Sequence, residues 1–226
     1  MQPAVPHHPG PGHQQKEKIA RQMAERVRSG DVIGVGSGST SLLALQAIAA
    51  RMKQEKLACT AIPTSHEIAL ACADLGVPVT SLMSRVPDWG FDGADEVDPA
   101  KNLIKGRGGA MFREKLVMKA SPKTYILADS SKFVDRLGTR FPVPVEVYPE
   151  ALRRVEKDLQ ALDTTEVTLR LCQGGKDGPV ITEQGNVILD VKFRDIGPGL
   201  EREIKALAGV LDSGLFQDWP VEIVSG

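Results

Sequence analysis

Aromatic residues are scarce in this 226-residue chain, where Phe, Trp and Tyr together make up 4%. The hydrophobic core must therefore rest mainly on Ala, Val, Ile and Leu. The hydrophobic fraction of 42% and the charged fraction of 25% are nevertheless ordinary for a globular protein. The length is enough for one large domain, or for one domain with a smaller one beside it.

Long apolar runs and a charge excess are also missing. No apolar run reaches the roughly 18 residues that a membrane-spanning helix needs. The first fifteen residues, MQPAVPHHPGPGHQQ, lack the apolar centre of a signal peptide. The formal net charge is −1 with no long basic block, which argues against a nucleic-acid-binding protein. We therefore expect neither a membrane nor a nucleic acid as a partner.

The chain contains only three cysteines, and their spacing matches no disulfide or metal-binding motif. Cys59, Cys72 and Cys172 form no CxxC motif and no even framework. Cys59 and Cys72 lie among apolar residues, as small core side chains do. This usage predicts a reducing, intracellular compartment, and hence a cytoplasmic location.

Histidine is confined to two places. His7, His8 and His13 belong to an N-terminal segment rich in Pro and Gly. We therefore expect residues 1–14 to be a disordered, solvated tail rather than a metal site. His66 precedes a helical pattern and is expected on the surface. No metal site is predicted.

Strand and helix patterns alternate through the first part of the chain. Helical patterns cover 16–28, 41–52, 67–75 and 109–120, and the strand-like segments are DVIGVG, LACTAIPTS, VPVTSL, WGFDGAD and TYILADSS. This alternation predicts right-handed crossovers and a Rossmann-like α/β fold: a mostly parallel open sheet with flanking helices.

The pattern changes after residue 137. Prolines space the segment 141–150, an amphipathic helix follows over 151–162, and ITEQGNVILD predicts a hairpin that turns at 184–186. We expect a smaller α+β lid domain over residues 138–211. Residues 15–137 and 212–226 then form the α/β catalytic domain, with VEIVSG returning to the main sheet.

A loop of glycines and hydroxyls, GVGSGST, joins the first strand to a helix. Glycines permit close backbone approach, and the N–H groups of a helix N-terminus favour an anion. Ser37, Ser39 and Thr40 add hydroxyl donors. The loop is neither a GxxxxGK[ST] nor a clean GxGxxG motif, so a phosphate or phosphosugar fits better than a nucleotide. A tight turn with a Ser/Thr cap is the alternative.

Two aspartates follow the WGF strand in GFDGADEVD. Asp92 and Asp95 fall at its carboxyl end, where open α/β sheets bind ligands, and Gly93 allows the turn between them. Close carboxylates shift each other's pKa and suit proton transfer to sugar hydroxyls. An acidic surface turn is one alternative. Mg²⁺ is another, but Lys105 and Arg107 lie nearby and disfavour a hard-metal site.

The third motif, KGRGGAMFREK, combines a basic glycine loop with a helix. Lys105 and Arg107 offer cations and backbone donors to an oxyanion. Glu114 follows, and its neighbours one helical turn away are Ala110, Met111, Val117 and Met118. Partial desolvation raises the pKa of such a carboxyl group and makes it a better base near neutrality. Arg113 has similar neighbours, so a simple ion pair for Glu114 stays open.

Lys132 ends the fourth motif, ADSSK. It follows a strand, so it is either a solvated strand-end lysine or part of a site. Because the carboxyl ends of parallel strands meet at one edge, we expect all four motifs to converge there.

In this order, these stretches resemble the type A family of ribose-5-phosphate isomerases. The matching pieces are GVGSGST, DGADEVD, KG-x-GGA-x-x-REK, ADSSK, FPVPVEV and GNVILD. The resemblance extends from about Lys16 to Phe216. The joint occurrence of DGADE, the KG loop with REK, and ADSSK is highly specific, whereas any one of them alone is not.

The resemblance implies a cofactor-independent aldose–ketose isomerase that interconverts D-ribose 5-phosphate and D-ribulose 5-phosphate. Glu114 is then the base that moves a proton between C2 and C1, and Lys105 stabilises the enediolate oxygen. Asp92 and Asp95 bind sugar hydroxyls and assist ring opening. The implied substrate-binding residues are Ser37, Gly38, Ser39, Thr40, Gly93, Ala94, Gly106, Arg107, Gly108, Lys132 and Lys16.

Members of that family are usually homodimers or homotetramers, so the resemblance also implies an oligomer. Two alternatives come from other classes. A related sugar-phosphate or acyl-CoA enzyme would share the strand and glycine-loop core, but no clear nucleotide-pocket motif is present. A non-catalytic phosphosugar sensor would carry a helix-turn-helix segment, for which the short N-terminal lead has no room.

Overall fold

The computed structural model describes residues 12–226, so the predictions for His7 and His8 lie outside the described residues. The expected tail of residues 1–14 is wrong at its end, because His13 and Gln14 already belong to helix α1 (His13–Arg26). His13 Nε2 lies 3.2 Å from Glu17 Oε1 on the next turn of that helix. The helix forms because Ile19 and Met23, one turn apart, are both fully buried.

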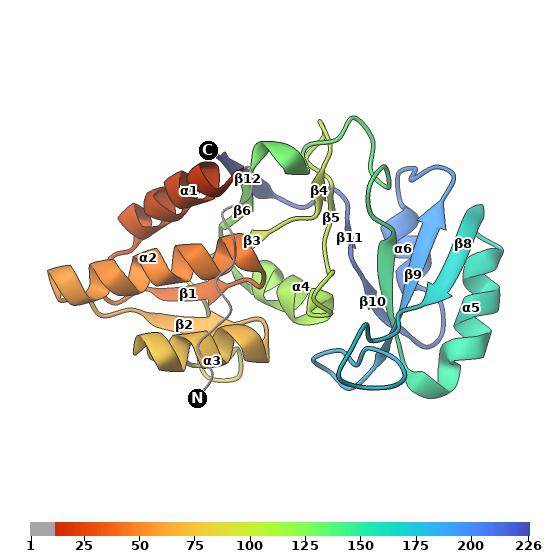
Figure 1. Cartoon of the computed structure of the whole chain (residues 1–226), viewed down its shortest axis with the longest axis horizontal. Coiled ribbons are helices and arrows are strands. Elements are labelled where there is room, and N and C mark those ends of the chain that lie inside the picture. The colour runs from red at the N-terminus through yellow and green to blue at the C-terminus, as the bar shows by residue number, and fades with distance from the viewer. Residues whose placement is uncertain (1–11) are drawn as a thin grey trace.

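The main sheet is parallel throughout, with strand order β12-β6-β3-β1-β2. Its strands are β1 (Val32–Val35), β2 (Thr60–Pro63), β3 (Trp89–Gly93), β6 (Thr124–Ala128) and β12 (Val221–Ser225). The expected return of the last strand is confirmed, since β12 pairs with β6. Figure 1 shows α1, α2 (Ser39–Glu55) and α3 (His66–Leu75) beside this sheet.

Both faces of the main sheet are covered, as a parallel sheet requires. Ile33 and Val35 belong to the core cluster that α1, α2 and α3 cover. Val32 packs instead with Val117 of α4 (Met111–Ala120) on the opposite face. Helix α4 lies so close to β1 that a Cβ atom at Gly34 would stand 2.4 Å from Val117 Cγ1. The sheet therefore fixes where α4, and with it Glu114, is placed.

A second, antiparallel sheet has the order β10-β7-β9-β8. Its strands are β7 (Val143–Val147), β8 (Thr164–Leu169), β9 (Val187–Phe193) and β10 (Val210–Ser213), and its helices are α5 (Leu152–Gln160) and α6 (Leu200–Lys205). Short 3-10 turns, η1 (Ser130–Lys132) and η2 (Pro149–Ala151), precede β7 and α5. The α/β class with a separate antiparallel region is confirmed, while the domain boundaries at 137/138 and 211/212 stay a prediction.

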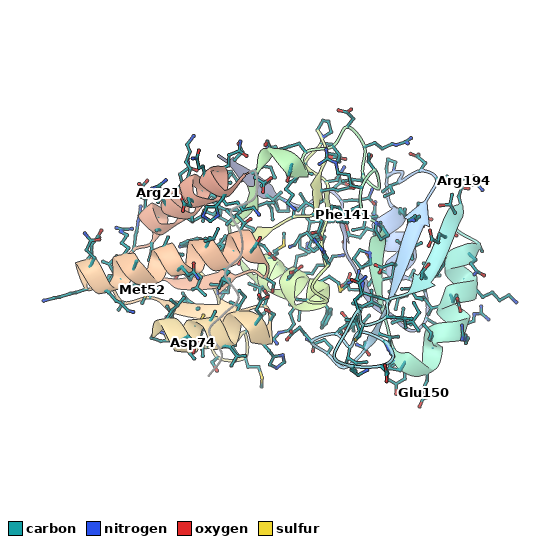
Figure 2. The ribbon with its side chains drawn as sticks, in the orientation of Figure 1. Arg21, Met52, Asp74, Phe141, Glu150 and Arg194 are labelled. Atoms are coloured by element: carbon teal, nitrogen blue, oxygen red, sulfur yellow. The ribbon has the colours of Figure 1, made fainter. Side chains whose placement is uncertain are left out.

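A small third sheet was not expected from the sequence. It has the order β11-β5-β4, from β4 (Glu96–Val97), β5 (Leu103–Ile104) and β11 (Leu215–Phe216). In Figure 1 it stands between the main sheet and the second sheet. Figure 2 follows the same layout: Arg21, Met52 and Asp74 lie at one end of the molecule, Glu150 and Arg194 at the other, and Phe141 between them.

Two strand predictions were wrong. The strand expected at 77–82 reduces to a single bridge between Val79 and Ala61, because Pro78 has no N–H and the chain turns at once into residues 81–84. The turn at 184–186 exists, with Gly185 N donating to Thr182 O over 3.0 Å. No strand precedes that turn, so β9 pairs with β7 and β8 instead of forming the expected hairpin.

Burial follows the sequence expectations elsewhere. Cys59 and Cys72 are buried free thiols, and burial raises the pKa of each to about 11. His66 is exposed at the start of α3, as expected. None of the helices within residues 12–226 has both the length and the apolar character needed to cross a membrane.

Candidate active site

A cavity of about 470 Å³ lies where the strands of the main sheet end. All of the predicted site residues line it except Asp92 and Lys16. The residues that line it are Ser37, Gly38, Ser39, Thr40, Ser65, Glu67, Gly93, Ala94, Asp95, Lys105, Gly106, Arg107, Gly108, Glu114, Lys132 and Glu183. The four motifs thus meet at one edge: three follow the parallel strands β1, β3 and β6, and the KGRGG loop follows β5 of the small antiparallel sheet.

A buried ammonium group stands at the centre of this site. Lys105 Nζ lies 3.0 Å from Asp92 Oδ2 and 3.2 Å from Glu114 Oε2, and it donates a hydrogen bond to Gly93 O over 2.6 Å. The three side chains are 2–5% exposed. Neither carboxylate oxygen facing Lys105 receives a well-directed hydrogen bond, although both are fully buried. The Lys105 ammonium group is therefore what compensates the charge of these two oxygens, at 3.0 and 3.2 Å.

The charges in this cluster shift one another's proton affinity. Burial and the negative charge of Asp92 raise the pKa of Glu114 to about 8, although Lys105 partly opposes the shift. Burial likewise raises the pKa of Asp92. For Lys105, burial works against the charged form, but Asp92 and Glu114 outweigh it and raise its pKa. Glu114 is therefore a carboxyl group that can gain and lose a proton near neutral pH.

Asp92 occupies a position behind the cavity wall. It is the fourth residue of β3, and Gly36, which follows β1, lies against it. A Cβ atom at Gly36 would stand 2.1 Å from Asp92 Cγ. The Asp92 side chain therefore faces Lys105 rather than the open cavity, and its predicted contact with a sugar hydroxyl stays a prediction.

Asp95 and the glycine loop form one wall of the cavity. Asp95 Oδ2 accepts a hydrogen bond from Arg107 N over 3.3 Å, and Lys105 N donates to Gly214 O over 2.8 Å. Gly106 adopts a φ of 94°, which favours glycine. The loop consequently turns so that Lys105 points inward while the Arg107 side chain is exposed.

The opposite side of the cavity is suited to an anion. Gly38, with a φ of 93°, caps the 17-residue helix α2 and offers no side chain to its first N–H groups. The hydroxyl groups of Ser39 and Thr40 begin that helix, and Lys132 also lines the cavity. Backbone N–H groups, hydroxyls and a cation form the donor set that a phosphate prefers.

Lys16 lies next to this anion-binding side without lining the cavity. Its Nζ atom is 3.4 Å from Ser39 Oγ and 3.8 Å from Asp129 Oδ2. The lysine thus adds positive charge beside the start of α2. Its direct contact with a substrate stays a prediction.

Three cavity residues escaped the sequence reasoning: Ser65, Glu67 and Glu183. Ser65 caps α3 by accepting a hydrogen bond from Ile68 N. Glu183 arrives from the turn before β9, where its Oε2 accepts from His66 N over 3.0 Å and from Arg113 Nη1 over 3.2 Å. A serine directly before a helical pattern is the signal that marks Ser65 as a helix cap. Nothing near Glu183 in the sequence predicts its contacts with His66 and Arg113.

Two further charged residues of the motifs have structural partners. Glu96 is fully buried and accepts hydrogen bonds from the backbone N–H groups of Gly138, Arg140 and Phe141. Lys115, next to Glu114, donates to Glu201, Asp212 and the Leu215 carbonyl oxygen. These contacts attach α4 and the acidic loop to the second sheet and its helix. Among residues 12–226, no group of three or more His, Cys, Asp or Glu side chains is arranged to hold a metal ion.

The comparison with protein families is decisive. Residues 60–226 match the model of ribose 5-phosphate isomerase A (phosphoriboisomerase A). The chain belongs to the ribose 5-phosphate isomerase A family. A relative named ribose-5-phosphate isomerase A from Thermosynechococcus vestitus is 44% identical over 207 residues, which cover 90% of this chain and 87% of the relative. One of that name from Methanothermobacter thermautotrophicus is 38% identical over 93% of each chain.

Solved structures of this family have the same fold. The structure of ribose 5-phosphate isomerase A from Methanocaldococcus jannaschii superposes with a TM-score of 0.88 at 38% identity, over 94% of each chain. A structure of D-ribose-5-phosphate isomerase in complex with phospho-erythronic acid gives a TM-score of 0.85 at 36% identity, over 90% of each chain. The family resemblance stated from the motifs is thus confirmed.

Proposed function

We propose that this chain interconverts D-ribose 5-phosphate and D-ribulose 5-phosphate through an enediolate, with Glu114 as the general base. Family membership supports the reaction. The observation that carries the mechanism is the Lys105 ammonium group, 3.0 Å from Asp92 and 3.2 Å from Glu114 at the wall of the cavity. A base and an electrophile side by side are what proton removal next to a carbonyl requires.

The phosphate group supplies the energy that positions the sugar. The start of α2, with Gly38, Ser39 and Thr40, and the Lys132 side chain form the side of the cavity that we assign to it. Contacts with this remote group orient the reacting carbons without taking part in the chemistry. The relative solved with phospho-erythronic acid, a phosphorylated sugar acid, supports a ligand of this class.

In our mechanism the Glu114 carboxylate removes the proton from C2 of the open-chain aldose. The electron pair moves to the C1 carbonyl oxygen, which becomes the enediolate oxygen beside the Lys105 ammonium group. Glu114 then returns the proton to C1, and the O2 hydroxyl proton moves to O1, so that C2 becomes the carbonyl carbon. No atom is gained or lost. A pKa of about 8 allows Glu114 to act as base and acid in turn.

The aspartates have two separate places in this scheme. Asp95 lines the cavity, so we assign it to the sugar hydroxyls during binding and ring opening. Asp92, behind Lys105, holds the ammonium group in place and tunes the pKa of Glu114. The resemblance also predicted contact of Asp92 with a hydroxyl group.

The test compares the rate of ribulose 5-phosphate formation for the wild type and for Glu114→Gln, with EDTA present. Gln keeps the shape of the side chain but cannot accept the proton, so we expect a loss of roughly 100-fold or more in kcat. Glu166→Gln is the matched control, because Glu166 is an exposed residue of β8 paired with Lys192. Its kcat is expected to equal that of the wild type.

Two outcomes would contradict the proposal in different ways. A wild type that binds ribose 5-phosphate in calorimetry without turning it over would be a phosphosugar sensor. A fully active Glu114→Gln variant would keep the isomerase and remove Glu114 as its base. An oligomer of two or four copies stays a prediction from the family resemblance, and light scattering after gel filtration would measure it. A cytoplasmic location stays a prediction from the cysteine usage.

A further inference from the structure

One guanidinium group connects the second sheet with the catalytic glycine loop. Arg170 follows β8, and its Nη1 atom donates to Gly106 O over 3.2 Å and to Arg107 O over 2.8 Å. Its Nε atom donates to Asp190 Oδ2 over 2.7 Å, and its Nη2 atom bonds the other oxygen of the same carboxylate. Arg170 thus uses both edges of its planar group, one on Asp190 and one on the loop.

The glycine content of the loop makes its backbone costly to order, so each contact that fixes it matters. Three glycines stand at 106, 108 and 109, and glycine loses more backbone freedom on ordering than any other residue. Gly106 and Gly109 also adopt positive φ angles, of 94° and 78°. A segment of this composition holds a buried lysine between two carboxylates only if other groups fix its backbone.

The far side of the loop is open. A second cavity, of about 330 Å³, lies there, and Asp95 and Arg107 line it together with Arg170 and Asp190. Asp95 and Arg107 line the catalytic cavity as well, so the loop is a wall between two spaces. Gly106 and Gly109 are buried, whereas Arg107 and Gly108 between them are exposed. The Arg170 hydrogen bonds come from this open side.

The partner of Arg170, Asp190, lies on an inner strand of the second sheet. Asp190 belongs to β9, where it stands opposite Thr168 of β8 and Pro144 of β7. The Pro144 ring also approaches Gly106, where an added Cβ atom would lie 3.2 Å from Pro144 Cγ. The side chains of Arg170 and Asp190 are 17% and 22% exposed, and neither lines the catalytic cavity. The pair can thus act on the reaction only through the loop.

We propose that Arg170 is a positioning residue of the isomerase, which fixes residues 105–107 from behind so that Lys105 stays beside Glu114. Asp190 orients the guanidinium group for this task. The inference rests on the proposed function, and it adds a specific role for the second sheet in the reaction.

The experiment measures kcat, KM and the pH profile of Arg170→Met, Asp190→Asn and Arg154→Met. A displacement of about 1 Å at a reacting group can cost roughly 100-fold in rate, so we expect Arg170→Met to lower kcat between 10- and 100-fold. KM for ribose 5-phosphate should change less than about threefold, because the assigned phosphate contacts lie on α2 and Lys132. Arg154, paired with Asp158 over 2.8 Å on the exposed face of α5, is the matched control.

The pH profile separates positioning from a merely structural role. Lys105 lowers the proton affinity of Glu114, so a displaced Lys105 should move the apparent pKa of kcat/KM upward in Arg170→Met. Asp190→Asn should shift kcat and the profile in the same direction by less, and the double variant should be non-additive. Arg154→Met should match the wild type. If Arg170→Met does not fold, Asp190→Asn decides by the same criteria.

Two results would overturn the inference. Folded variants with wild-type kcat and pH profile would make the pair structural only. Unchanged hydrogen exchange at amides 105–108 in Arg170→Met would exclude loop fixation without any need for turnover. Faster exchange in that variant, together with an inactive wild type, would instead support the fixation of the loop by Arg170 and refute the proposed function.

Discussion

Gly36 and Asp92 touch across neighbouring parallel strands, and the contact leaves no room for a side chain at residue 36. A Cβ atom there would lie 2.1 Å from Asp92 Cγ and 2.2 Å from its Oδ1. Because Asp92 in turn pairs with Lys105, the first glycine after β1 contributes to the position of the Lys105 ammonium group. The glycine loop therefore has a task besides anion binding.

Gly36→Ala should consequently damage catalysis more than stability. Overpacking of this kind costs about 1–3 kcal/mol of unfolding free energy. The displaced Asp92 and Lys105 should lower kcat/KM by roughly 100-fold, as misplacement of reacting groups does. Gly197→Ala is the control, because an added Cβ atom there meets nothing within 4 Å. Denaturant unfolding and initial rates measure both effects, and a wild-type rate for Gly36→Ala would contradict this role.

The pH dependence of the reaction should report the coupled carboxylates. Glu114 must be deprotonated to remove the C2 proton, and its pKa is raised to about 8. We therefore expect kcat/KM to rise with pH and to level off above about 8. Asp92→Asn removes a negative charge that raises this pKa, so the rise should shift to lower pH. A profile that is already flat at pH 5 to 6 would contradict the assignment.

The sequence predicted this edge of the sheet because three motifs follow strands β1, β3 and β6. Parallel strands place their carboxyl ends together, so GVGSGST, Asp95 and Lys132 could be assigned to one cavity before the fold was known. Lys105 reaches the same cavity from β5 of the small antiparallel sheet. The apolar neighbours of Glu114 similarly predicted its burial, which the structure confirms at 4% exposure.

The remaining contacts of the site depend on residues far apart in the chain. The sequence gives no sign that Glu96 of DGADEVD differs from a surface acid. The three backbone N–H groups that donate to it nevertheless lie 42 to 45 residues later in the chain. Glu183 reaches Arg113 across 70 residues. Local patterns carry no information on such pairs, because the arrangement of the second sheet decides them. The displacement of Asp92 behind Lys105 likewise follows from the Gly36 contact, which no spacing rule indicates.

Glu114 should also lower the stability of the fold at alkaline pH. Its pKa is raised from 4.5 to about 8, so the folded state binds this proton more tightly than the unfolded chain does. The stabilising contribution of the protonated group is present below about pH 4.5 and is lost as the pH rises through about 8. The glutamine in Glu114→Gln does not titrate. The melting temperature of the variant minus that of the wild type should therefore increase as the pH is raised from 5 to 9. A constant difference across that range would contradict the raised pKa.

Glu183 should link the second sheet to the catalytic side of the molecule. The turn that carries it is built on Glu146, a fully buried residue whose Oε1 accepts from Thr182 Oγ1 over 2.5 Å and from Asn186 Nδ2 over 2.9 Å. Glu183 then bonds both His66 and Arg113, beside the cavity that it lines.

Glu183→Gln keeps the size of this side chain but removes its charge. A hydrogen bond to a charged group contributes roughly 1.5–3 kcal/mol, so the variant should lose a measurable part of its unfolding free energy. Arg113 is adjacent to Glu114 on α4, and release of Arg113 should also lower kcat several-fold. Arg113→Met should lower kcat similarly, and the effects of the two changes on kcat should be less than additive, because both break the contact between Glu183 and Arg113. Fully additive losses would mean that the two side chains act independently, and the turn would then cover the cavity without holding α4.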